Sequence, residues 1–254
     1  KFDPPTRNRL HPMAGTEFDA VVVGSGPNGL VAALELAQAG WKVLVVERAD
    51  TPGGGTRTAE LTLPGFRHDV CSAIHPLGIA SPALRDLGLD QVGVEWVHPD
   101  APLAHALRPG HSVIQERSLA ATAVGLGVDG PPWERLFGPS VRSGLDLVDS
   151  LLDPLHLPPR HPIDLARYGT VGIWSVSALA RRRFKGDDGP ALLAGMAGHS
   201  MLSLDAPITT GFGMLLGQLA HLVGWPMAKG GSQAIADGLI RLIESLGGTV
   251  RCGE

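Results

Sequence analysis

A glycine-rich turn between an apolar run and a helix-forming segment constrains the fold of this chain more than any other feature. Residues 19–23 (DAVVV) are apolar and β-branched, as in a buried parallel strand. The turn that follows fits the pattern G-x-G-x-x-G and comprises Gly24, Ser25, Gly26, Pro27, Asn28 and Gly29. Residues 27–39 are rich in helix formers, Gly40 is placed to end that helix, and residues 42–46 (KVLVV) form a second apolar run. This order predicts a βαβ unit with two parallel strands.

The glycines of this turn have distinct physical roles. Gly24 makes the tight turn, Gly26 lets a pyrophosphate approach the backbone, and Gly29 permits close packing of helix and strand. The phosphates then lie at the positive end of the helix dipole. Glu47 ends the second strand, 18 residues after Gly29, where a carboxylate binds ribose hydroxyls and disfavours a 2′-phosphate; Arg48 follows it in the predicted site. The pattern predicts a dinucleotide, and both NAD and FAD fit because they share the ADP moiety.

Two further segments bear on the choice between NAD and FAD. The first runs from Gly53 through Gly54, Gly55, Thr56 and Arg57 to Thr58, and is followed by residues 64–69 (PGFRHD). It resembles the glycine-pair and arginine motif that follows the second strand in the phytoene desaturase and amine oxidase superfamily of flavoproteins. Residues 225–231 (WPMAKGG) resemble the second glycine pair of the same superfamily, which leads into a helix and returns the chain to the FAD domain.

The likeness is greatest to bacterial phytoene-desaturase-like FAD-dependent oxidoreductases, and it covers residues 17–77 and 222–250. It implies FAD as the cofactor. The residues that the resemblance places along the cofactor are Gly54, Gly55, Thr56, Arg57, Thr58, Gly230 and Gly231. Backbone amides and a fixed arginine suit an extended diphosphate. Asp69 either holds a backbone amide near the flavin or caps its own turn. Members of the superfamily are much longer, and nothing in this chain matches their C-terminal half.

The fold class is α/β: a Rossmann-like FAD-binding domain with a parallel central sheet, and a largely helical inserted substrate domain. Four segments are expected. They are a disordered leader over residues 1–12, the first part of the FAD-binding domain over 13–100, a substrate-side domain over 101–221, and a truncated return to the FAD-binding domain over 222–254.

Local patterns predict the later elements. Residues 82–87 are expected to form a short helix and residues 92–97 a strand, and residues 100–225 are expected to be mainly helical. Apolar residues recur at helical spacing from Ile235 to Leu246, with Ser232 as the expected N-cap and Gly247-Gly248 as the stop. Residues 249–252 then predict another strand.

Composition excludes several partners. A net charge of −4 gives no electrostatic footprint for nucleic acid. Cys71 and Cys252 are too few for a metal cluster or a disulfide framework, so no metal and a reducing cytoplasm are expected, with Cys71 buried. Residues 206–228 contain no charged side chain, but prolines and glycines interrupt them, which predicts a buried helix lining an apolar cavity rather than a membrane span. Residues 181–185 (RRRFK) are either a solvated helix end or a peripheral membrane contact.

The functional hypothesis is an FAD enzyme whose flavin removes a hydride from an apolar, isoprenoid or lipid-like substrate. No catalytic residue is assigned, because no carboxylate or nucleophile accompanies His68, His75, His199 or His221 at a suggestive spacing. Amine oxidation is an alternative, but one Tyr and six Phe supply an aromatic cage poorly. Another alternative is a truncated or split flavoprotein half that is inactive alone and needs a second chain or a missing C-terminal half. Its unpaired sheet edge then predicts association. A nicotinamide-only dehydrogenase is disfavoured by the two glycine pairs.

Overall fold

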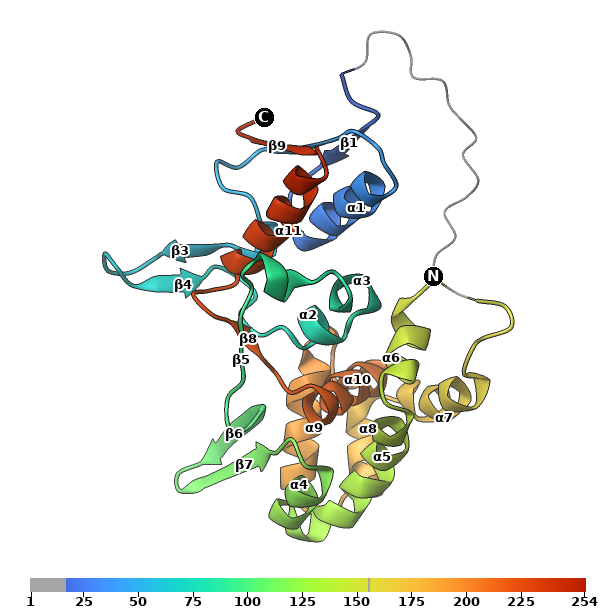
Figure 1. The fold of residues 1–254 in the computed structure, drawn as a ribbon. Helices are drawn as coiled ribbons and strands as arrows, with labels where there is room; N and C mark the ends of the chain where they lie inside the picture. The colour runs from blue at the N-terminus through green and yellow to red at the C-terminus, as the bar shows by residue number, and fades with distance from the viewer. Residues whose placement is uncertain (1–16, 155) are drawn as a thin grey trace. The chain divides into compact units, whose positions relative to one another are not determined.

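The computed structural model describes residues 17–154 and 156–254, which form two compact units (Figure 1). The α/β unit comprises Leu87–Val97, Met227–Glu254 and the described part of Lys1–Ile74. The helical unit comprises His75–Asp86 and His98–Pro226. Residues 75–86, expected in the first domain, therefore cluster with the helical unit, and the predicted leader over residues 1–12 lies outside the described residues.

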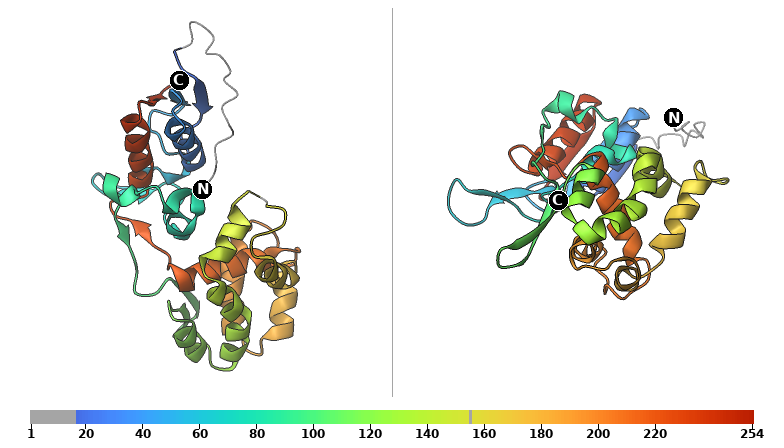
Figure 2. Two further views of the ribbon diagram at one scale, coloured as in Figure 1. Left: turned by 45° about the vertical axis from the view of Figure 1, so that its right-hand side comes forward. Right: turned by 90° about the horizontal axis from the view of Figure 1, so that it is seen from below.

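The α/β unit is built on a parallel sheet. Its strands are β1 (Ala20–Val23), β2 (Val43–Glu47) and β9 (Thr249–Cys252), in the order β1-β2-β9. Helices α1 (Pro27–Gln38) and α11 (Gln233–Ser245) lie side by side and pack against it (Figures 1 and 2). The predicted α/β fold and its parallel sheet are confirmed.

The apolar periodicities explain these elements. Helix α11 buries Ile235, Leu239 and Ile243 on one face, as their spacing predicts. Alternate residues of β1 face opposite sides of the sheet. Val21 and Val23 lie on the side away from α1 and are 57% and 85% exposed, so the outer face of β1 is not covered by the described residues.

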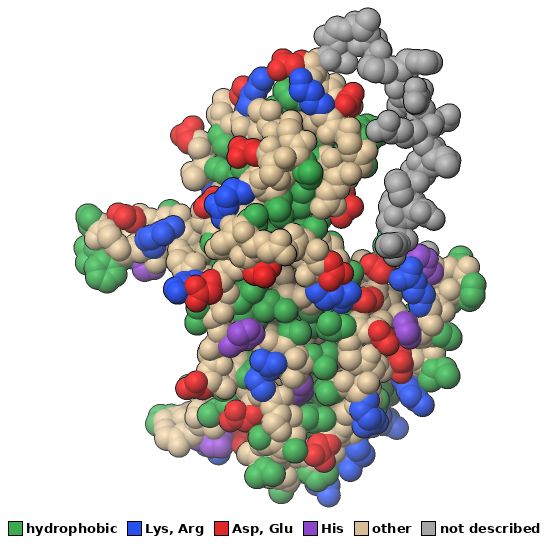
Figure 3. All heavy atoms as spheres, in the orientation of Figure 1, with side chains coloured by type: hydrophobic (Ala, Val, Ile, Leu, Met, Phe, Trp, Pro, Cys, Tyr) green, Lys and Arg blue, Asp and Glu red, His purple; other side chains and the backbone are tan. Residues whose placement is uncertain are grey.

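Short elements complete the α/β unit. They are the 3-10 turns η1 (Gly54–Thr56) and η2 (Leu89–Val92), the antiparallel hairpin β3 (Thr58–Glu60) and β4 (Arg67–Asp69), and the paired strands β5 (Trp96–Val97) and β8 (Met227–Ala228). Apolar side chains gather at the β3–β4 tip (Figure 3), where Leu61, Leu63 and Phe66 are exposed. The prediction of a strand over residues 92–97 is wrong for its first part. Gly93 has φ +88° and ends the turn η2, and Val94 is buried against α11, so only Trp96–Val97 form a strand.

The helical unit is largely helical, as predicted. Its elements are α2 (Pro76–Ala80), α3 (Pro82–Arg85), β6 (Leu103–Arg108), β7 (His111–Gln115), α4 (Leu119–Gly125), η3 (Gly127–Asp129), α5 (Gly130–Ser143), α6 (Leu145–Leu152), α7 (Pro162–Gly172), α8 (Val176–Arg183), α9 (Asp188–Gly198) and α10 (Thr209–Leu222). The antiparallel hairpin β6–β7 corrects the expectation of helix throughout. The Pro109-Gly110 turn is the sequence feature that indicates it, and burial alternates along β6 in the structure.

Helix α10 packs against α5, α7 and α9 and carries the uncharged segment noted in the sequence. Its buried residues include the polar Thr209, Thr210 and Gln218, so a buried helix is confirmed. No helix among the described residues is long and apolar enough to cross a membrane.

A buried histidine joins α10 to the rest of the helical unit. His221 Nδ1 lies 3.2 Å from the carbonyl oxygen of Arg117, which can only accept, so Nδ1 carries the proton. His221 Nε2 then accepts hydrogen bonds from Trp133 Nε1 (3.3 Å) and Gln115 Nε2 (3.2 Å). Burial lowers the pKa of His221, and the two donors at Nε2 favour the neutral ring.

Replacement of Gly29 by alanine tests the close approach of α1 to the preceding turn. A Cβ atom at Gly29 would overlap the carbonyl oxygen of Gly24. We expect Gly29→Ala to lower the free energy of unfolding by about 1–3 kcal/mol in urea denaturation. Gly26→Ala is the matched control, because a Cβ atom there meets no heavy atom within 4 Å. Equal stability of the two variants would contradict the close approach.

The pH dependence of stability tests the His221 network. The unfolded chain takes up a proton on this histidine at about pH 6.5, whereas the folded chain resists it to lower pH. The unfolded state therefore binds more protons as the pH falls below about 6.5, and the free energy of unfolding decreases. Denaturation between about pH 7.5 and 5.5 should show this loss in the wild type and a smaller one in His221→Gln. The same slope in both proteins would refute the assignment.

Candidate functional site

The turn between β1 and α1 presents an open N-terminal helix end. Gly24 has φ +95°, and Gly26 is the N-cap of α1 at φ −64° with no side chain capping it. A Cβ atom at either glycine would meet no heavy atom within 4 Å. The turn is therefore open on the side of these two glycines, and the uncapped helix end suits a phosphate approaching the backbone.

Glu47 is fixed beside this turn. Its Oε2 accepts hydrogen bonds from the amide (2.9 Å) and hydroxyl (2.7 Å) of Ser25, and its Oε1 accepts one from the amide of Ala49 (2.9 Å). The Ala49 hydrogen bond, followed by those from Ser25, lowers the pKa of Glu47 to about 2. The carboxylate is thus ionised and keeps acceptor capacity for ribose hydroxyls. Ser25, predicted as a cofactor contact, is buried, and its side chain holds the carboxylate.

The segment after β2 packs onto the same turn. The amide of Gly53 donates to the carbonyl oxygen of Ser25 (3.1 Å), and a Cβ atom at Gly54 would lie 2.9 Å from the Cα of Gly26. Arg57 Nε donates to the carbonyl oxygen of Gly54 (3.0 Å), which fixes the guanidinium near the turn. The structure therefore brings together residues 24–29 and 53–57, which the sequence placed in separate motifs.

The second glycine pair, Gly230-Gly231, is joined to the segment after β2 through residues of the β3–β4 hairpin. Thr58 Oγ1 donates to Asp69 Oδ1 (2.7 Å) and accepts from the amide of Gln233 (3.0 Å), while Asp69 Oδ1 accepts from the amide of Ser232 (2.7 Å). A Cβ atom at Gly231 would lie 2.5 Å from Thr58 Oγ1, so these two residues are in contact. Thr58 and Asp69 thus hold the first turn of α11.

The structure corrects the role predicted for Ser232 and the burial predicted for Cys71. The Ser232 hydroxyl does not cap α11 but donates to the carbonyl oxygen of Ser72 (2.7 Å). Cys71, expected to be buried, is exposed and lies in the loop that follows β4. Asn28 and Arg48 are also exposed, and Thr56 is buried.

Gln233 is a residue that the sequence patterns did not single out. Its Nε2 donates to the carbonyl oxygen of Pro52 (3.1 Å) and to Asp237 Oδ1 (3.0 Å), so it links α11 to the segment after β2. The one sequence signal for this role is its place two residues after Gly231, at the start of the predicted helix.

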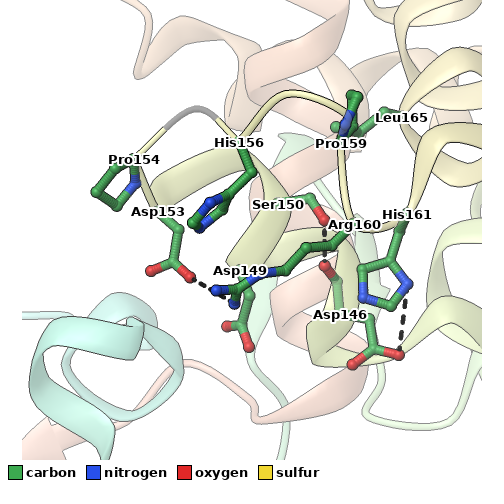
Figure 4. A pocket seen from close by; sticks show the side chains of 10 residues that line it. All are labelled: Asp146, Asp149, Ser150, Asp153, Pro154, His156, Pro159, Arg160, His161 and Leu165. Carbon is green, nitrogen blue, oxygen red and sulfur yellow. Dashed lines mark hydrogen bonds and ion pairs between the residues drawn. The ribbon is translucent and has the colours of Figure 1, made fainter. Parts of the chain in front are cut away.

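A hollow in the helical unit gathers acidic and histidine side chains (Figure 4). Its volume is about 170 Å³. Arg160 pairs with Asp153 (3.6 Å), and His161 Nδ1 lies 4.0 Å from Asp146. Arg85, which lies outside the lining residues, pairs with Asp149 (2.9 Å). The carboxylates of Asp149 and Asp153 are thus paired with arginines. No group of three or more His, Cys, Asp or Glu side chains among the described residues is arranged to hold a metal ion.

Comparison with protein families and curated proteins agrees with this geometry. Residues 22–87 match the family described as the NAD(P)-binding Rossmann-like domain. One of the subunits of limonene dehydrogenase from Castellaniella defragrans is 38% identical over 97 residues, which are 38% of this chain and 17% of that protein. The neurosporene-forming phytoene desaturase of Cereibacter sphaeroides is 42% identical over 69 residues, 27% of this chain and 12% of that protein.

Among solved structures, wild-type putrescine oxidase bound to putrescine superimposes with a TM-score of 0.57 at 18% identity. The match covers 93% of this chain and 51% of that one, so the chain spans about half the length of this structural relative. The sequence resemblance to phytoene desaturase is confirmed over 69 residues, and the fold resembles about half of putrescine oxidase. At this identity the structural match shows the fold.

Replacement of Gly26 by alanine separates nucleotide binding from folding. The φ of −64° suits alanine and the space around Gly26 is open, so stability should not change. The added methyl group enters the space through which a diphosphate approaches. We expect the affinity for ADP in calorimetric titration to fall at least about tenfold, equivalent to about 1.4 kcal/mol. Gly125→Ala, at an open glycine of α4, should bind ADP like the wild type. Unchanged affinity in Gly26→Ala would contradict the assigned site.

Proposed function

We propose that this chain, whose α/β unit has the nucleotide-binding fold of FAD-dependent oxidoreductases, binds FAD and forms part of an enzyme that removes a hydride from an apolar substrate. One observation carries the proposal. Residues 24–29, Glu47, residues 53–58 and the pair Gly230-Gly231 are widely separated in sequence, and hydrogen bonds and close contacts join the segments that contain them into one site.

The site has groups for each part of the ADP moiety. The ionised Glu47 accepts hydrogen bonds from ribose hydroxyls, and its charge disfavours a 2′-phosphate. The uncapped N-terminus of α1 binds the diphosphate. Gly54, Gly55 and Arg57 supply backbone amides and a guanidinium for the extended part of the cofactor. When bound, the flavin supplies the hydride acceptor, and this chain's residues position it.

Sequence relatives support FAD over NAD alone. The matched domain family is named for NAD(P), whose ADP half would bind this turn in the same way. The match to phytoene desaturase, together with the second glycine segment, supports FAD. A nicotinamide-only dehydrogenase would leave the contact between Gly231 and Thr58 without a role at the cofactor.

The substrate class is proposed from the helical unit. Helix α9 buries mainly apolar side chains, and α10 adds Met214 and Leu219, which suits an isoprenoid or lipid-like substrate. Amine oxidation, suggested by the likeness to putrescine oxidase, is less well supported, because the single Tyr of the chain, Tyr168, donates its hydroxyl to the carbonyl oxygen of Gly211. A cytoplasmic location, with or without a peripheral membrane contact at residues 181–185, stays a prediction.

A second polypeptide, or a further segment of the same one, is proposed to complete the enzyme. Val21 and Val23 on β1 are exposed, and so are Leu61, Leu63 and Phe66 at the β3–β4 tip. Apolar surface of this kind is typical of an interface. The relative from Castellaniella defragrans is named as one subunit of its dehydrogenase, which supports a multi-chain enzyme. On this proposal the chain alone binds the cofactor and lacks full activity.

The absorbance spectrum of the purified chain tests the cofactor. We expect flavin bands, and FAD should be released on denaturation and identified by chromatography. Gly26→Ala, prepared in parallel, should contain less FAD, because its methyl group enters the phosphate approach, whereas the cofactor-free forms of the two proteins should be equally stable. A colourless wild-type protein that also fails to bind added FAD would overturn the proposal for this chain.

Sedimentation velocity tests the exposed face of β1. The chain alone is expected to self-associate, because the edge of β1 and its exposed valines are available to another sheet. Val23→Lys should reduce this association. Val124→Lys, at an exposed valine of α4 in the helical unit, is the matched control and should not. A monodisperse wild-type monomer would refute the expectation.

A further inference from the structure

A second cavity lies entirely within the helical unit. It opens between α5, α7 and α10, with additional residues from α6 and α8, and its volume is about 240 Å³. None of the proposed FAD-binding residues lines it, since those residues belong to the α/β unit. Its chemistry is therefore independent of the nucleotide site.

The floor of this cavity is apolar and uncharged. Leu147 and Met214 are 1% and 3% exposed, and Leu136 and Val171 are partly buried beside them. The ring of Tyr168 also lines the cavity, and its hydroxyl donates to the carbonyl oxygen of Gly211 (2.6 Å). Burial raises the pKa of Tyr168, so this wall stays neutral at physiological pH.

The hydroxyl groups of the cavity already donate their protons to the backbone. Ser140 donates to the carbonyl oxygen of Phe137 (3.0 Å) and Ser143 to that of Pro139 (3.1 Å). Thr170 likewise bonds the carbonyl oxygen one turn before it (2.9 Å). The donors left for a bound molecule are consequently the guanidinium groups.

Three arginines stand at the edge of the cavity, and each comes from a different helix. They are Arg135 of α5, Arg167 of α7 and Arg183 of α8. Asp164 is the one carboxylate among the lining residues and lies 3.8 Å from Arg167. Within the described chain, no carboxylate lies within 4.0 Å of Arg135 or Arg183. Lys and Arg side chains gather on this side of the helical unit (Figure 3).

We propose that this cavity binds a small amphipathic anion, with its apolar body against Leu147 and Met214 and its carboxylate or phosphate group at Arg135 and Arg183. An uncharged apolar floor favours a hydrocarbon body, and guanidiniums at the opening bind planar or tetrahedral anions. Ligand cavities usually measure about 300–1,000 Å³. The smaller volume here selects a medium-length chain over a long one. This site goes beyond the proposed oxidoreductase activity and does not depend on it.

Calorimetric titration of the whole chain with sodium octanoate tests the proposal. Octanoate should bind at least about tenfold more tightly than 1-octanol, which lacks the charge, or inorganic phosphate, which lacks the chain. Arg183→Gln should weaken octanoate binding about tenfold through the lost charge-assisted hydrogen bond. Arg181→Gln is the matched control, because it removes the same charge from the same helix outside the cavity, and should change affinity less than about twofold.

A further variant tests the location of the ligand. Thr170→Trp, at an exposed position on the cavity edge, should block octanoate binding while the thermal unfolding temperature stays near that of the wild type. Three outcomes would overturn the proposal. They are equal affinity for phosphate and octanoate, equal loss in Arg181→Gln and Arg183→Gln, and binding to vesicles of anionic phospholipid without any binding of octanoate.

Discussion

The pair formed by Ser25 and Glu47 is the interaction on which the α/β unit depends. Through it the turn after β1 is bound to the end of β2 by two hydrogen bonds to one carboxylate oxygen. Because these hydrogen bonds fix Ser25, its carbonyl oxygen is placed to accept a hydrogen bond from the amide of Gly53. This contact orients the segment that follows β2. A carboxylate that accepts hydrogen bonds from a backbone amide and a hydroxyl stays ionised, so the same interaction sets the charge that the proposed site offers to a ribose.

Contacts beyond this pair extend the site in order along the chain. Gly54 lies against Gly26, and Arg57 is held by the carbonyl oxygen of Gly54. Thr58 and Asp69 then hold the N-terminal amides of α11. Each contact joins two backbone segments or fixes a side chain, which leaves little freedom for the proposed nucleotide-binding surface. Such preorganisation favours tight binding, since less conformational entropy is lost when the ligand arrives.

The sequence predicted the elements whose patterns are strong and local. β1, α1, β2, α11 and β9 follow from apolar periodicity and glycine stops, and they form the sheet and its helices. The hairpin β6–β7 was missed because its alternation is interrupted by polar residues and lies beside long helical segments.

At the site, the sequence motifs identified candidate residues but not the groups with which these residues form hydrogen bonds. Ser25 holds Glu47, Ser232 binds the carbonyl oxygen of Ser72, and Gln233 links α11 to Pro52. These contacts depend on how distant segments meet, and no local pattern encodes them.

The central claim is that Glu47 and the Gly24–Gly29 turn bind the ADP half of a dinucleotide without a 2′-phosphate. Calorimetric titration of the cofactor-free chain with ADP-ribose and with 2′-phospho-ADP-ribose tests it directly. The account predicts that ADP-ribose binds at least about tenfold more tightly, because a 2′-phosphate would face an ionised carboxylate. Equal affinity for the two ligands, or no binding of either, would contradict it.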